Sequence, residues 1–167
     1  MNEAERIAEE LSQGYDGTPW HGASLAEILE PVDAMIAAAR PISHAHTIWE
    51  LVLHLTGWTS EVTSRLEGNT SGLPPEGDWP DMPPPTPAAW LDALDRLRDA
   101  RRKLDAAIRA FPPAKLNEIV EPGPMEESAV RFTFRTMLHG VAQHDSYHAG
   151  QISLLRKAAQ RPINNYP

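Results

Sequence analysis

Residues 47–67, TIWELVLHLTGWTSEVTSRLE, decide the fold class. Thr47 and Glu50 match a capping box, in which the threonine hydroxyl accepts from a backbone amide and the glutamate side chain reaches back to the start of the helix. The apolar residues of the stretch are spaced three or four apart: Ile48, Leu51, Leu55, Trp58, Val62 and Leu66. This spacing predicts a long helix with one face buried against a helical core.

Helical patterns recur on both sides of this stretch. The other long ones span residues 2–13, 87–111 and 133–159, and two short ones span residues 24–30 and 31–40. Period-2 alternation is nearly absent, and residues 116–120 are the one candidate strand. Four long amphipathic helices without a sheet predict an all-α fold, a four-helix bundle.

Proline separates the two central helices. Seven of the 16 prolines lie between residues 74 and 87, a density that excludes a helix interior or a central strand. We interpret this segment as a long crossover loop within a single domain, residues 1–167. A proline-rich ligand for a partner's aromatic groove is the alternative.

Composition excludes several classes of function. There are 15 Lys and Arg against 23 Asp and Glu, a formal net charge of −8, which disfavours binding to nucleic acid or anionic lipid. No signal peptide or apolar run of membrane-spanning length is apparent, so we expect a cytoplasmic protein without membrane partners. Because cysteine is absent, any metal must bind to His, Asp or Glu. The expected partners are a small molecule and a second copy of the chain.

Two histidines share one helical face. His144 and His148 are four residues apart, so their rings point within about 40° of each other, one turn apart. They fall inside the apolar stripe of residues 133–159 and should face the core, where each ring nitrogen needs a partner. The zinc-protease motif does not apply, because Asp145 stands where that motif has Glu. Asp145 could instead orient a neighbour, pair with Arg or Lys, or face another subunit.

A third histidine completes a candidate metal site. His54 lies beside Trp58 at the edge of the apolar stripe of residues 47–67. Antiparallel neighbouring helices can bring His54 to His144 and His148. Three such ligands leave positions for water or substrate, the open arrangement of a catalytic site. Without thiolates, Zn²⁺, Ni²⁺, Fe²⁺ and Mn²⁺ all remain candidates.

Other polar residues are candidates for roles near such a site. Candidate groups around the ligands are Glu50, Glu61 and Gln151, each of which has a solvated or capping role as its alternative. Tyr147 could hold an oxyanion near a metal or simply pack. His21, on a loop, could close over the site or be an ordinary loop residue. The three other histidines are expected to be structural: His44, His46 and His139.

The sequence also resembles a known family. Residues 139–152, HGVAQHDSYHAGQI, and residues 48–58, IWELVLHLTGW, are similar to the DinB-like superfamily of metal-dependent enzymes, and residues 19–22, PWHG, resemble a feature of some members. The resemblance spans about residues 2–160. It implies an up-up-down-down bundle with a long crossover, a homodimer, and a divalent metal on the three residues that match the family's ligands, His54, His144 and His148.

The activities that this resemblance implies are S-transfer or isomerisation with a low-molecular-weight thiol, and hydrolysis. We therefore expect a metal-dependent transferase or hydrolase that acts on a small electrophilic molecule, with Zn²⁺ or Ni²⁺ first and Fe²⁺ or Mn²⁺ as alternatives. One alternative is a non-catalytic metal-binding or stress-response protein. Another is a helical bundle whose core histidines are satisfied by hydrogen bonds. Trp79 and Met82, apolar residues in the proline-rich loop, would suit a dimer interface.

Overall fold

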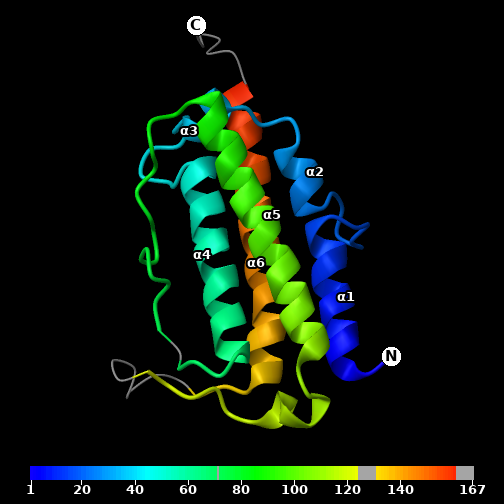
Figure 1. The fold of residues 1–167 in the computed structure, drawn as a ribbon. Helices are drawn as coiled ribbons and strands as arrows, with labels where there is room; N and C mark the ends of the chain where they lie inside the picture. The colour runs from blue at the N-terminus through cyan, green and yellow to red at the C-terminus, as the bar shows by residue number, and fades with distance from the viewer. Residues whose placement is uncertain (71, 124–130, 161–167) are drawn as a thin grey trace, which may run out of the picture.

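Four long helices form most of the computed structural model, which describes residues 1–70, 72–123 and 131–160 (Figure 1). They are α1 (Glu3–Tyr15), α4 (Ile48–Leu66), α5 (Pro87–Ala110) and α6 (Phe134–Gln160). Two short helices, α2 (Leu25–Leu29) and α3 (Ala34–Ala38), lie between α1 and α4, and a 3-10 helix, η1 (Pro113–Asn117), follows α5. The all-α prediction is confirmed. Residues 124–130 and 161–167 of the expected single domain lie outside the described part of the chain.

The candidate strand at residues 116–120 is not one. Leu116 and Asn117 end η1, and the neighbouring residues contribute only an isolated bridge between Ile119 and Thr133. In the described residues this bridge is the only β pairing. Within the same residues, no helix is long and apolar enough for a membrane span.

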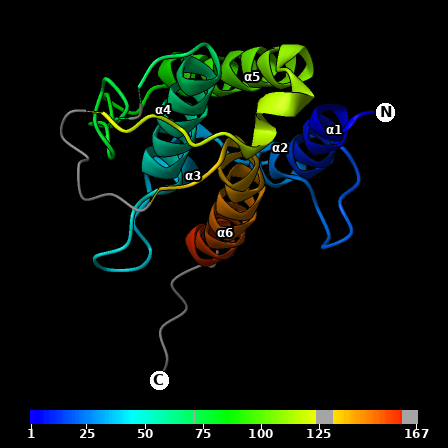
Figure 2. The same cartoon turned by 90° about the horizontal axis from the view of Figure 1, so that it is seen from below.

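The long helices pack in a ring. Helix α4 packs against α5 and α6, and α1 packs against the same two helices. Figure 2, which views the molecule from below, shows α6 between α4 and α1. Helices α5 and α6 are therefore diagonal neighbours, as are α1 and α4.

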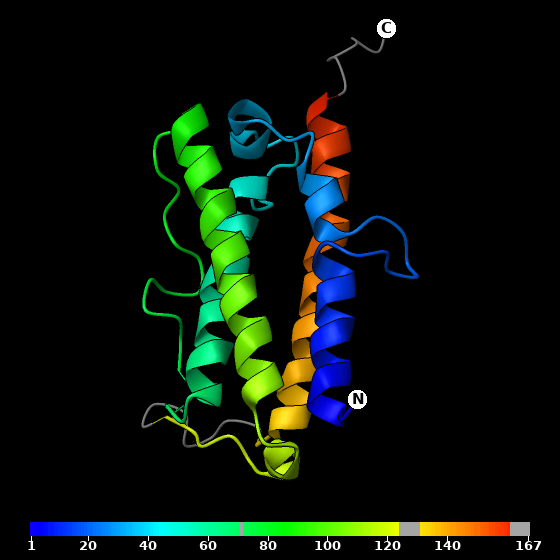
Figure 3. The same ribbon diagram turned by 45° about the vertical axis from the view of Figure 1, so that its right-hand side comes forward.

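The direction of the helices corrects one expectation. In Figures 1 and 3, α1 and α6 run upward while α4 and α5 run downward. The order along the chain is up-down-down-up, and the expected up-up-down-down order is wrong. That order contains two parallel pairs of consecutive helices and needs two long crossovers. Here α4 and α5 are the one such pair, and the proline-rich segment connects them.

The helix starts follow the sequence closely. The hydroxyl of Thr47 accepts from the Glu50 amide at 3.1 Å, and the Glu50 carboxylate accepts from the Thr47 amide at 2.7 Å. Thr86 caps α5 by accepting from the Ala89 amide at 3.2 Å. These bonds satisfy backbone donors that the first turn of a helix leaves without a partner. The capping box expected at the start of α4 is therefore present.

The crossover lies along α4. The Glu61 carboxylate accepts from the Gly72 amide, and Arg65 donates to the Gly72 carbonyl, both at 2.9 Å. The loop comes close to the helix at Gly57, where a Cβ atom would lie 3.2 Å from Cβ of Pro74. Glycine at this position permits the close approach, which brings the following loop residues past His54.

Buried apolar residues form two clusters, one toward each end of the molecule. Along α6, one cluster ends at Val141 and the other begins at Ala149. His144, Asp145 and His148 fall between them. The histidines of the candidate site therefore lie at the junction of the two apolar clusters.

A buried ion pair spans the ring diagonally. Nη1 of Arg101, on α5, donates to Oδ2 of Asp145, on α6, at 2.6 Å, and Nη2 donates to the other carboxylate oxygen. Both side chains are buried. Since the backbones of α5 and α6 are diagonal neighbours, the long arginine side chain is what joins them.

Removing one member of this pair should destabilise the fold. Arg101→Leu leaves the Asp145 carboxylate buried without its partner, so we expect the free energy of unfolding to fall by about 3–5 kcal/mol. The double variant with Arg101→Leu and Asp145→Leu should recover most of that loss, because it leaves no uncompensated charge. Urea unfolding of both variants and the natural protein measures this. A double variant no more stable than the single one would contradict the account.

Candidate metal centre

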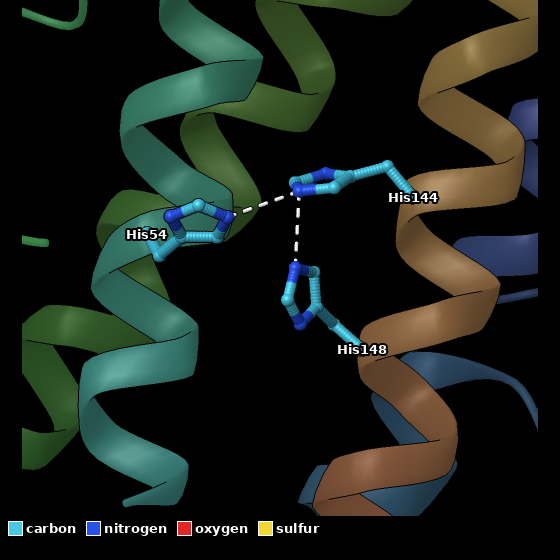
Figure 4. Close-up of side chains that lie close together, drawn as sticks. All are labelled: His54, His144 and His148. Atoms are coloured by element: carbon cyan, nitrogen blue, oxygen red, sulfur yellow. Dashed lines mark hydrogen bonds between the residues drawn. The ribbon is translucent and has the colours of Figure 1, made fainter. Parts of the chain in front are cut away.

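Three imidazoles from two helices point at one another. His54 lies on α4, and His144 and His148 lie on α6 (Figure 4). Nε2 of His144 is 3.0 Å from Nε2 of His54 and 3.0 Å from Nε2 of His148. One ligand atom from each ring lies within 4.8 Å of the other two. The structure thus brings together the residues that the sequence singled out, and their role as metal ligands stays a prediction.

The opposite ring nitrogens of two of these histidines have acceptors. Nδ1 of His54 donates to the backbone carbonyl of Asp78, and Nδ1 of His148 donates to Oε1 of Gln151, both at 2.7 Å. An Nδ1 that donates must carry the proton of a neutral imidazole, so Nε2 keeps its lone pair. Metal-binding histidines are held in this tautomer by the same kind of hydrogen bond.

The three Nε2 atoms carry too few protons to satisfy one another, which favours a cation between the rings. Nε2 of His54 and Nε2 of His148 both present lone pairs to Nε2 of His144. A neutral His144 has at most one proton on that atom, which can donate to only one of the two neighbours. One of the two 3.0 Å approaches is then between lone pairs, which is unfavourable unless a positive charge lies between the rings. Three imidazoles are a donor set suited to Zn²⁺, Ni²⁺ or Fe²⁺, so the residues fit a divalent metal.

Burial keeps the rings neutral. It lowers the pKa of His144 to about 4, with further lowering by the nearby His148 and His54. Burial also lowers the pKa of His148, although the hydrogen bond to Gln151 opposes this shift. Neutral imidazole is the form that binds metals, so both rings are ready to bind at neutral pH.

The proline-rich loop completes the surroundings of His54. The indole of Trp79 stacks on the His54 ring with centroids 4.0 Å apart, and its other face stacks on His46 at 3.5 Å. Nε1 of Trp58 donates to Oδ1 of Asp78 at 2.7 Å, which holds the loop where its carbonyl meets His54. Trp79, considered above for a dimer interface, is thus stacked between two histidine rings.

Of the three polar residues expected around the ligands, one contacts a histidine ring and two do not. Gln151 contacts His148. Glu50 does not contact the three rings: it caps α4 and accepts from Arg40 at 2.8 Å. Glu61 is engaged by Arg65 and by the crossover. The two carboxylates serve the helix and the loop, which is the alternative considered for them above.

The residues next to the ligands also have other partners. Asp145 pairs with Arg101 on α5, and pairing with Arg or Lys is one of the alternatives that the sequence left open for it. Tyr147 is 65% exposed, and its ring meets the edge of the His148 ring at 5.0 Å between centroids. Of the remaining histidines, His46 stacks on Trp79 as described above, and two others lie away from the three rings. His139 pairs with Glu10 at 3.1 Å, and His21 lines a separate cavity between the loop after α1 and α6.

A cavity of about 550 Å³ opens beside the three rings. His54 and His144 form one end of it, and Phe132 lies in its wall. A smaller hollow of about 320 Å³ adjoins His148 and Trp79 on another side. A metal bound by the three imidazoles would therefore be next to a space large enough for a small molecule.

The protein is thus of the all-α class, and its candidate metal centre lies between two adjacent helices, α4 and α6. The family model of the DinB superfamily matches residues 20–152, a segment that contains all three histidines. The chain belongs to the DinB superfamily. No curated protein and no solved structure matches it.

Loss of the Gln151 acceptor should weaken metal binding. In Gln151→Leu, Nδ1 of His148 has no acceptor, and the ring is free to turn or to change tautomer. Zn²⁺ affinity should fall roughly 10–100-fold, the usual effect of removing such a partner. Competition with a chromophoric chelator measures it, and Gln143→Leu, on the exposed side of the same helix, is the matched control. Equal affinities for the two variants would refute the role of Gln151.

The stability of the metal-free protein should depend on His144 at acid pH. The unfolded chain takes up a proton on His144 near pH 6.5, whereas the folded chain does so only near pH 4. The free energy of unfolding should therefore fall as pH decreases from 6.5 to 4 and change no further on this account below pH 4. Urea unfolding of chelator-treated protein measures it. His144→Gln should show a shallower fall, and an unchanged pH dependence would contradict the prediction.

Proposed function

We propose that the protein is a metal-dependent enzyme that acts on a small electrophilic molecule. Nε2 atoms of His54, His144 and His148 would hold one divalent cation. The observation that carries the proposal is the convergence of these three atoms, with Nε2 of His144 at 3.0 Å from each of the other two, beside a cavity of about 550 Å³. A structural metal site has no use for such a space, whereas a substrate needs one.

The chemistry follows from the donor set. Three protein ligands leave at least one coordination position open, as in catalytic sites. A divalent cation there lowers the pKa of a bound water or thiol and so supplies a nucleophile at neutral pH. This suits a chain without cysteine, which has no thiol nucleophile of its own. A low-molecular-weight thiol would make the reaction an S-transfer, and water would make it a hydrolysis.

The protein's own residues prepare the site. Gln151 and the Asp78 carbonyl fix the proton on Nδ1 of two ligands, so that their lone pairs face the centre. Trp79 covers one face of His54 and restricts its rotation. The cavity would place the electrophile at the open side of the centre. Zn²⁺ or Ni²⁺ is the preferred cation in this proposal, with Fe²⁺ and Mn²⁺ as alternatives.

The unit that carries this function is, in our proposal, the whole chain as one four-helix bundle. Its ligands come from α4 and α6, which are far apart in the sequence and adjacent in the ring. A fragment with only one of these helices would lack the complete ligand set.

Metal content is the first test. Protein produced without a histidine tag should retain about one equivalent of divalent metal per chain, as measured by elemental analysis after gel filtration. His54→Ala should lose most of it, because two imidazoles bind far more weakly than three, and the triple variant at His54, His144 and His148 should lose all of it. His139→Ala, which removes a half-buried histidine that lies on the same helix as two ligands and pairs with Glu10, should keep its metal.

Turnover is the second test. Metal-loaded protein should accelerate either the reaction of a thiol with 1-chloro-2,4-dinitrobenzene or the hydrolysis of a nitrophenyl ester, and His54→Ala should not. Retained metal without turnover of any electrophile would favour a non-catalytic metal-binding protein. No metal, and no uptake on reloading, would mean that hydrogen bonds alone satisfy the core histidines.

A further inference from the structure

We propose that the cavity beside the three histidines binds an uncharged molecule with an apolar body, and that Gly140 leaves the space for it. Its role as a substrate site rests on the function proposed above. The binding preference itself stands on the walls of the cavity, so the two can be tested apart.

The walls away from the histidines are mainly apolar. At about 550 Å³, the cavity falls within the range typical of small-molecule sites. The apolar side chains in its wall come from three segments: Trp58 and Val62 on α4, Phe132 before α6, and Met137 and Val141 on α6. Such a surface gains free energy by covering apolar area of a ligand.

The charged groups in the described wall already have protein partners. Arg65 donates to Glu61 at 3.0 Å and to the Gly72 carbonyl at 2.9 Å. The Asp145 carboxylate is held by Arg101.

Asp78 differs, because its partner at 2.7 Å, Nε1 of Trp58, is neutral and leaves the negative charge of the carboxylate in place at the histidine end. A negatively charged substrate body would lose its hydration in this cavity and would find no free cation among the described lining residues, since Arg65 is paired with Glu61. Burying a negative charge in this way is costly, so the wall selects a neutral body over an anionic one.

The hydroxyls in the wall are also engaged. Thr59 donates to the Leu55 carbonyl at 2.7 Å, and the hydroxyls of Thr136 and Thr133 are 3.1 Å apart. The free polar atoms are therefore at the histidine end. This arrangement would orient a ligand with its reactive group toward His54 and His144 and its apolar body toward Phe132.

Gly140 is the position that keeps the cavity open. It lies one turn before His144 on α6 and lines the cavity. A Cβ atom built at Gly140 meets no other atom within 4 Å, so a larger side chain there would enter empty space without a clash at Cβ. Gly150 is an equally open glycine on the same helix, but it is exposed and does not line the cavity. The two positions form a matched pair for substitution.

The experiment measures aryl binding by ¹⁹F NMR. The probes are 4-fluorotoluene, which is neutral, and 4-fluorobenzoate, which has a similar ring and one negative charge, and the protein is treated with chelator so that no metal serves as a counter-ion. For the natural protein, the neutral probe should bind about tenfold or more tightly than the anion, because the anion must give up its hydration and meets no free cation in the wall. In Gly140→Leu, affinity for 4-fluorotoluene should fall about tenfold or more, because the leucine fills the cavity, and in Gly150→Leu it should be unchanged. Replacing glycine by leucine raises helix propensity at both positions, so both variants should fold.

Three results would overturn the inference: no binding of 4-fluorotoluene up to its solubility limit, equal affinity for the two probes, or equal affinity in Gly140→Leu and the natural protein. Metal content is measured on the same preparations before chelator treatment. A natural protein that binds the neutral aryl probe through Gly140 but retains no metal would refute the proposed metal-dependent function and support the cavity inference. A protein with about one equivalent of metal and no selective aryl binding would do the opposite.

Discussion

The structure depends on the need of buried imidazoles for partners. His54 and His148 are each about 95% buried, and an unpaired polar nitrogen at such depth costs free energy. Each ring meets this need on one side with a hydrogen bond from Nδ1 and on the other by facing the remaining imidazoles. The first side is supplied by the protein alone. The second side would be completed by a cation shared among the three rings, as proposed above.

Two features on opposite sides of the histidines hold the rings in position. On one side, the proline-rich crossover lies along α4 and delivers the Asp78 carbonyl and the Trp79 ring to His54. On the other side, Asp145 turns away from the centre and joins α6 to α5 through Arg101. Because neighbouring helical residues differ by about 100° in direction, His144 can face α4 while Asp145 faces α5. One turn of α6 thus serves the site and the fold at the same time.

Local patterns predicted the helices and the helical histidines that converge, and non-local contacts set the rest. The spacing of His144 and His148 and the capping box at Thr47 are properties of short helical stretches, so the sequence was sufficient for them. The order of helix directions depends on which ends the loops connect, and apolar periodicity does not encode that. Asp78 and Trp79 lie in a loop without periodicity, so nothing local indicated that they meet His54. Gly140 carried no signal at all, because an open space opposite a glycine is visible only in three dimensions.

The charges around the site explain how its parts would work together. Three neutral imidazoles would leave the full double charge of a bound divalent cation on the centre, whereas a carboxylate ligand would cancel part of it. Two nearby acidic groups are directed elsewhere: Asp145 is paired with Arg101, and Glu61 with Arg65. The carboxylate of Asp78 lies on the Nδ1 side of His54, with Oδ1 3.3 Å from that atom, and so away from Nε2. In a cavity of low polarity such a charge acts more strongly on a bound water or thiol than it would in water. A neutral electrophile is also the kind of molecule that the apolar wall accepts, so the cavity would admit the reactant while the centre holds the nucleophile.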